Sequence, residues 1–347
     1  MIHRLPWNLL IKTFIIVVFG WFLAQRLNTQ NDPGALWGIF VTQMRSGSPW
    51  ILCLVVLMMP LNWMMEIIKW RMLMRPAVVL SWRKAIAGVL SGIAFSLFTP
   101  NRIGEYGGRI LYVDRKYTWN VVMASLTGSF AQNLVHISFG LVAAMILFST
   151  TLDLPRVTGS GMWVLSACVI FVIWGVYWYL PHFARALGEG HPPRFLTRPW
   201  KALAHISQTT RRQLGLALVC AATRYAIFTL QYVLLLQYFG VEVPWIWLTG
   251  GVAVIYLMQT SIPLPPFVDL IARNELGIVL WAGFGINELS IIAAGLGIWI
   301  LNLVLPALFG LLAIATVNIL RSLGYENAPI SSSLAQPPAH IVDRTAS

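Results

Sequence analysis

Six long apolar stretches constrain this chain more than any other feature. A helix needs about 20 apolar residues to cross the hydrocarbon core of a bilayer. A soluble helical core would explain one or two such stretches, but not six. The sequence therefore predicts an integral membrane protein. The stretches are 9–24, 50–65, 121–148, 162–180, 214–239 and 289–317.

The charged residues agree with this prediction. They make up only 10% of the 347 residues, whereas soluble domains carry about 25%. The net charge of +12 could suggest nucleic acid, but topology explains it better, because cytoplasmic loops of membrane proteins are rich in Lys and Arg. We expect no nucleic-acid partner, no cofactor and no metal site. The three cysteines are too scattered to form a metal site.

The basic residues also predict an orientation. They cluster in 66–84 and in 181–213, whereas 26–49 and 149–160 contain few. The positive-inside rule places both clusters in the cytoplasm. Arg4 and Lys12 put the N-terminus there too, with 9–24 as an uncleaved first helix.

Two further apolar segments are interrupted by proline. If 85–98 crossed the membrane, 121–148 could not leave from the cytoplasm, so we expect 85–113 to break near Pro100 and return to the same side. Residues 245–262 run into a second break, with prolines at 263, 265 and 266, and 267–284 return. By this count the second hairpin enters from the opposite side.

The predicted fold is therefore an all-α polytopic membrane protein with six to eight transmembrane helices, two Pro-broken re-entrant hairpins and an inverted internal repeat. One domain would span 1–321, and a disordered tail would follow at 322–347. The domain would consist of a first half at 9–180, a basic cytoplasmic connector at 181–213 and a second half at 214–321. The stretch 289–317 could be one helix or two, so the side of the C-terminus stays open.

An acid and an arginine stand four residues apart after each break: Glu105 with Arg109, and Asp269 with Arg273. On a helix this spacing places both side chains on one face. Interrupted apolar segments at matching positions of two halves are typical of transporter binding sites. The same pairs could instead only neutralise each other and lock the hairpins. Both interpretations remain open, for these residues and for Arg102.

Three other groups of polar residues lie in or near the apolar stretches. Arg224 should face the protein interior and meet an acid or a phosphate, the hairpin acids being candidate partners. Glu66 and Lys69 stand near a helix end, so we expect them to reach towards water. A polar stripe on 121–148 should form hydrogen bonds between helices. The stripe contains Ser125, Ser129, Gln132, Asn133 and His136.

These residues resemble a known family. Pro100, Arg102, Gly104 and Glu105, followed by Arg109, resemble the P-x-R-x-G-[ED] hairpin of the lysylphosphatidylglycerol synthase transmembrane-domain family, the flippase-like proteins. The second hairpin and the segment 302–310 also look like that family, although Pro265-Pro266-Phe267 replaces its usual Gly-rich turn. Bifunctional members add a soluble aminoacyl-transferase domain, which we do not expect here.

The resemblance implies lipid handling. We expect a non-enzymatic, flippase-like transporter in the bacterial cytoplasmic (inner) membrane that moves or binds an anionic phosphorylated lipid. The candidate substrate-binding residues are Arg102, Glu105, Arg109, Arg224, Asp269 and Arg273. Two alternatives remain: a membrane-embedded transferase acting on a polyprenyl-phosphate lipid, and a non-transporting scaffold that binds envelope-synthesis enzymes.

Overall fold

The computed structural model describes residues 47–97, 99, 103–151, 156–190, 197–262 and 264–315, together with residues 38, 41, 42 and 45. Helices form throughout this part of the chain, and it contains no β-strand, so the predicted all-α class is confirmed. The α-helices are α3 (Pro49–Leu73), α4 (Trp82–Ser96), α5 (Gly104–Ile110), α6 (Thr118–Thr151), α7 (Arg156–Gly188), α8 (Thr197–Ser207), α9 (Arg211–Tyr238), α10 (Trp245–Ser261), α11 (Pro266–Trp281), α12 (Glu288–Trp299) and α13 (Leu305–Ala315).

Five helical stretches in the described residues are long and apolar enough to cross a membrane, which supports the predicted integral membrane protein. They are Pro49–Leu73, Arg115–Thr150, Gly159–Gly188, Arg211–Tyr238 and Glu288–Ala315. The predicted first helix at 9–24, Arg102 and the tail at 322–347 lie outside the described residues.

The last stretch is one continuous helical segment. A π-helical turn, Ile300–Val304, joins α12 to α13 without a break. Pro306 has no N–H to donate to the carbonyl of Asn302, so an irregular turn just before this proline is expected. π turns are often found at functional sites, and Asn302 lies within this one.

The first interrupted segment is a pair of helices in close contact. After α4 ends at Ser96, the backbone N–H of Gly104 donates to Thr99 Oγ1 at 2.8 Å, and α5 begins. A Cβ on Gly108 would lie 2.3 Å from the backbone nitrogen of Gly92. Only glycine can occupy such a crossing, so this sequence lets α5 lie directly on α4.

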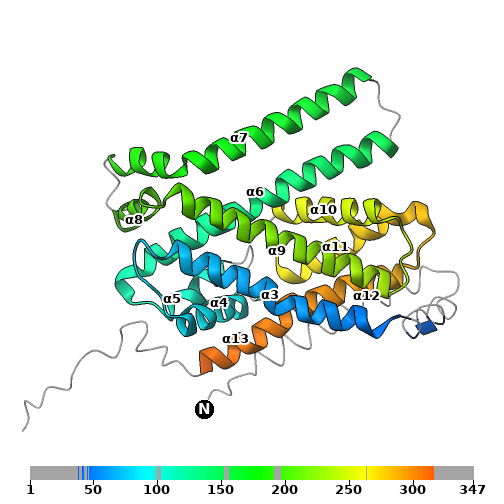
Figure 1. Ribbon diagram of the computed structural model, residues 1–347, viewed down its shortest axis with the longest axis horizontal. Helices are drawn as coiled ribbons and strands as arrows, with labels where there is room; N and C mark the ends of the chain where they lie inside the picture. Colours follow the sequence, from blue (N-terminus) through cyan, green and yellow to red (C-terminus); the bar gives the residue numbers. More distant parts are fainter. Residues whose placement is uncertain are drawn as a thin grey trace, which may run out of the picture.

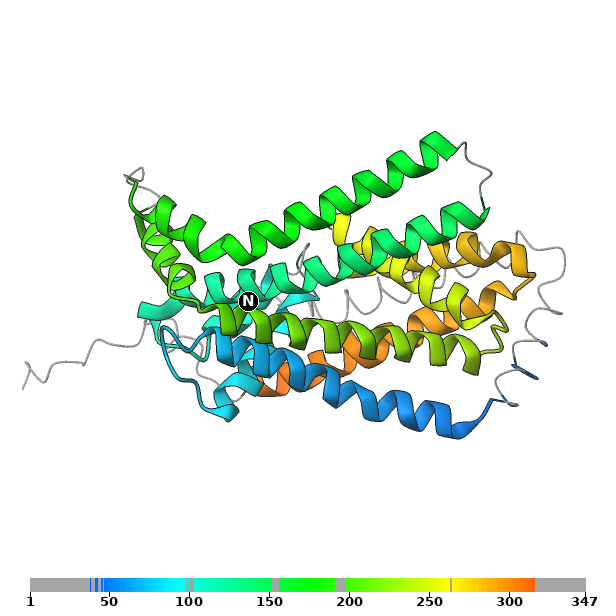
Figure 2. The same cartoon turned by 45° about the horizontal axis from the view of Figure 1, so that its top comes forward.

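The second interrupted segment joins α10 to α11. Pro266 stands in the first turn of α11. The N–H groups of a first turn have no acceptor within the helix, so a proline there costs no hydrogen bond. In Figures 1 and 2 the chain turns back at each break towards the end of the bundle from which it came. The two pairs enter from opposite ends.

The element order occurs twice. A long helix, a broken pair and a second long segment appear as α3, α4/α5 and α6, and again as α9, α10/α11 and α12–α13. Corresponding elements run in opposite directions (Figure 1). The packing exchanges partners between the halves: α3 lies along α9, α4 against α13, and α10 against α6.

Helix α7 lies at the edge of the bundle, in contact with α6 and α8 (Figure 2). Much of its length presents exposed apolar side chains such as Phe171 and Val172. In a bilayer this surface can face lipid without cost, because lipid chains are as apolar as the side chains.

Candidate functional site

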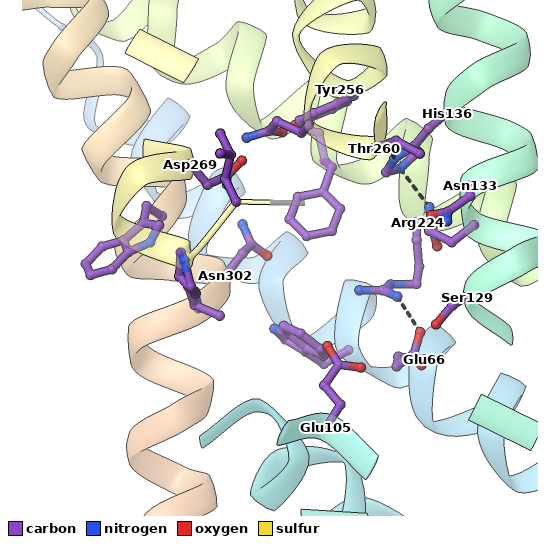
Figure 3. A pocket seen from close by; sticks show the side chains of 18 of the residues that line it. Glu66, Glu105, Ser129, Asn133, His136, Arg224, Tyr256, Thr260, Asp269 and Asn302 are labelled. Atoms are coloured by element: carbon purple, nitrogen blue, oxygen red, sulfur yellow. Dashed lines mark hydrogen bonds and ion pairs between the residues drawn. The ribbon is translucent and has the colours of Figure 1, made fainter. Parts of the chain in front are cut away.

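A cavity of about 540 Å³ lies between the two broken pairs. Glu105 and Tyr106 of α5 line it from one side, and Leu264, Pro266, Asp269 and Arg273 from the other. The remaining lining residues come from α3, α6, α9, α10, α12 and the π turn. Figure 3 shows Glu66 and Glu105 at one end of the cavity and Tyr256 and Thr260 at the other.

Glu66 is the centre of a buried charge cluster. Its Oε1 accepts from Arg109 Nη2 at 2.9 Å, and its Oε2 accepts from Lys69 Nζ at 2.7 Å and from Arg224 Nη1. Arg109 Nη2 also reaches Glu105 Oε2 at 3.2 Å, and its Nη1 donates to Ser125 Oγ at 3.1 Å. Among the described residues, the three cations and two carboxylates of this cluster leave one net positive charge.

One sequence prediction is corrected here, and one is confirmed. Glu66 and Lys69 do not reach towards water, because only 6% and 2% of their surfaces are exposed. Arg224 does pair with an acid, as expected, and its partner Glu66 on α3 was not among the candidate acids of the sequence analysis. A signal for Glu66 was present in the sequence: Arg109 and Arg224, in separate apolar regions, both require a counter-charge.

A row of amides continues from this cluster. Arg224 Nε donates to Asn62 Oδ1 at 3.0 Å, and Asn62 Nδ2 donates to Asn302 Oδ1 at 2.9 Å. Asn302 Nδ2 then donates to Gln231 Oε1 at 3.0 Å. This row ties α3, α9 and the π turn together, so the turn holds Asn302 both in the network and on the cavity wall.

The second acid–arginine pair lies at the α11 side. Arg273 Nη2 donates to Asp269 Oδ2 at 3.2 Å, as the spacing predicted. Arg273 Nε is buried and has no hydrogen-bond partner in the described residues. Both side chains line the cavity and are partly accessible, at 12% for Arg273 and 24% for Asp269.

The polar stripe on α6 forms the predicted hydrogen bonds between helices. Besides the bond from Arg109 to Ser125, Gln132 Nε2 donates to the carbonyl of Ala221 at 3.3 Å. His136 Nδ1 lies 3.0 Å from Thr260 Oγ1, and its ring is stacked on Tyr256 at 5.5 Å between centroids. Four members of the stripe also line the cavity: Ser129, Gln132, Asn133 and His136.

The candidate residues therefore divide into three groups. Glu105, Arg224, Asp269 and Arg273 line the cavity. Arg109 is not one of the lining residues; it holds Glu66 and Glu105 in place from behind. Arg102 lies outside the described residues.

The cavity contains groups that can bind an anion. In the described part of the chain, no three His, Cys, Asp or Glu side chains converge as metal ligands. The lining combines three cations and three carboxylates with amides, hydroxyls and aromatic rings. Guanidinium groups suit phosphate well, because their N–H donors can engage two oxygens at once.

Comparison with known proteins identifies the chain's relatives. The family model described as the lysylphosphatidylglycerol synthase TM region matches residues 9–335. No curated protein matches the chain significantly, and no solved structure does. Since the match covers nearly the whole sequence, the chain belongs to the lysylphosphatidylglycerol synthase transmembrane-region family, as its hairpin residues suggested.

Proposed function

We propose that this protein is a flippase-like transporter that binds the phosphate of an anionic lipid in the central cavity and moves the lipid across a bacterial cytoplasmic membrane. The family is a membrane domain of lipid-related proteins. The observation that carries the proposal is a cavity between two opposed helix pairs, with three cations and two carboxylates clustered at one end among the described residues.

The electrostatics support an anionic ligand. Buried charges are stable only when they are paired and hydrogen-bonded. Among the described residues, the cluster around Glu66 contains three cations and two carboxylates, one more cation than acid. A lipid phosphodiester carries one negative charge and would complete the balance, near Arg224 and Lys69.

The arrangement of the helices supports movement of the ligand. Discontinuous helices that enter from opposite sides and meet at midplane are typical of alternating-access transporters. In this proposal the α4/α5 and α10/α11 pairs dip into the bilayer as re-entrant hairpins. The ion pairs on α5 and α11 would hold their helices closed until phosphate displaces a carboxylate.

The test uses the Asp269–Arg273 pair, because it is the more accessible one. The purified full chain is placed in vesicles with fluorescent phosphatidylglycerol, and dithionite quenching reports the rate of lipid translocation. We expect Arg273→Gln to lower that rate about tenfold or more, which corresponds to a loss of about 1.4 kcal/mol. Arg185→Gln, the same change at an exposed position of α7, is the matched control and should not alter the rate.

The double variant Asp269→Asn/Arg273→Gln separates substrate contact from structural locking. It removes both charges, so no unpaired carboxylate remains in the cavity. If Arg273 contacts the phosphate while the lipid moves past the α11 side of the cavity, the double variant stays folded and remains slow. Recovery of the normal rate would reject this contact, and a wild-type rate equal to that of protein-free vesicles would overturn the proposed function.

A further inference from the structure

The cavity wall away from the charge cluster is rich in neutral polar groups. Gln132 and Asn133 of α6 face the cavity together with Gln259 and Thr260 of α10. Figure 3 places Asn133, His136 and Thr260 on this side and Glu66 and Glu105 at the charged end. We refer to Gln132, Asn133, Gln259 and Thr260 as the amide wall.

Two buried atoms of the amide wall lack partners. Gln132 Oε1 and Gln259 Nε2 make no hydrogen bond to any described residue. The first can only accept, and the second can only donate. Buried polar atoms usually have hydrogen-bond partners in folded proteins. Because Gln132 and Gln259 both line the cavity, a group bound in the cavity can supply the two missing partners.

These two requirements limit the chemistry of the ligand. An ammonium group can only donate and would leave Gln259 Nε2 unpaired. A carboxylate can only accept and would leave Gln132 Oε1 unpaired. A hydroxyl donates and accepts, so a group with several hydroxyls satisfies both atoms.

Aromatic rings add a second requirement. Phe228, Tyr256 and Trp299 also line the cavity. Tyr256 is on α10, as are Gln259 and Thr260, and the rings of Phe228 and Tyr256 lie edge to face at 6.4 Å. The negative face of an aromatic ring attracts the weakly positive C–H face of a saturated ring. The volume of about 540 Å³ is within the range of pockets that enclose whole small molecules, about 300–1,000 Å³, so a phosphate alone would leave most of it empty.

We propose, on the basis of the proposed function, that the lipid headgroup is a phosphodiester whose second substituent is a polyhydroxylated ring, a sugar or a cyclitol. The phosphate lies beside Arg224 and Lys69 at the charged end. The ring hydroxyls bond to Gln132 and Gln259 of the amide wall, and its C–H face packs on the aromatic side chains.

The test compares two lipids with the same charge. Phosphatidylinositol and phosphatidylethanol, with identical acyl chains, each carry one phosphodiester, but only the first has ring hydroxyls. Each competes with fluorescent phosphatidylglycerol for the purified full chain in detergent. We expect phosphatidylinositol to compete about tenfold more strongly, the factor that 1.4 kcal/mol of binding free energy represents.

Variants assign the preference to the amide wall. Gln259→Leu should lower the affinity for phosphatidylinositol until the ratio of the two affinities is close to one. The affinity for phosphatidylethanol should stay the same. Gln237→Leu is the same substitution on α9, outside the cavity lining, and should keep the preference. Equal competition by the two lipids in the wild type, or an unchanged ratio in Gln259→Leu, would overturn this inference.

Two further outcomes have separate meanings. If fluorescent phosphatidylglycerol does not bind at all, the proposed function fails and not only the headgroup assignment. Soluble myo-inositol 1-phosphate is the third competitor. If it competed as strongly as phosphatidylinositol, the ligand would be a free sugar or cyclitol phosphate, and the assignment to a lipid would be rejected.

Discussion

Replacing Glu66 by glutamine is the most direct test of the buried charge cluster. The substitution keeps the shape of the side chain and removes the carboxylate that pairs with Lys69, Arg109 and Arg224. Arg109 retains Glu105 at 3.2 Å, and Arg224 retains Asn62 at 3.0 Å. Lys69, which is 2% exposed, is left with no carboxylate among the described residues.

The structure sets the expected size of the effect. Removing one partner of a buried ion pair costs about 3–5 kcal/mol, because it leaves an uncompensated charge. Here the net charge of the cluster, counted over the described residues, rises from +1 to +2 with little exposure to water. We therefore expect Glu66→Gln to lower the free energy of unfolding by about 3–5 kcal/mol.

Unfolding in mixed dodecyl sulfate micelles, followed by circular dichroism, measures this free energy. Glu242→Gln makes the same change at an exposed position and should stay within about 0.5 kcal/mol of the wild type. Adding Lys69→Met to Glu66→Gln removes the stranded ammonium and should recover most of the loss. A loss below about 1 kcal/mol in Glu66→Gln, the value of an exposed pair, would refute the description of Glu66 as a buried counter-charge.

Two further predictions concern the α4/α5 crossing and α8. Gly108→Ala should lower the yield of folded protein on size-exclusion chromatography, because its Cβ would lie 2.3 Å from the nitrogen of Gly92. The control Gly107→Ala should fold normally, because a Cβ there would have nothing within 4 Å. Equal yields of the two variants would contradict the close crossing of α4 and α5. Burial lowers the pKa of His205 on α8. The unfolded chain therefore binds the proton more readily, and stability should fall as the pH drops below about 6.5. A melting temperature that depends less on pH in His205→Leu than in the wild type, with no such change for the exposed His182→Leu, would support this; equal dependence would contradict it.

Much of the fold could be predicted from the sequence, because apolar length and proline are local signals. Five of the six apolar stretches appear as helices of membrane-spanning length. The acid–arginine spacing in 104–110 and 266–281 predicted both ion pairs within these helices. The period of a helix determines which side chains share a face, so such contacts need no tertiary information.

The contacts between distant segments could not be predicted in the same way. Glu66 lies seven residues before the end of α3, and nothing local distinguishes it from an acid that reaches water. Its burial depends on α5 and α9, whose arginines approach it from 43 and 158 residues away in the sequence. The position of Asn302 likewise depends on a π turn, which an apolar pattern of helical period does not reveal.

The exchange of partners between the halves has a consequence for biosynthesis. Helix α4 packs against α13, so the α4/α5 pair is synthesised long before the helix that covers it. Until the ribosome has completed the C-terminal segment, the α4/α5 pair and its charged side chains remain without this packing partner, in the membrane or at its surface. The packing of α4/α5 against the rest of the bundle should therefore be a late, all-or-none step. Ribosome-bound chains arrested before residue 305 should remain sensitive to protease near Gly104.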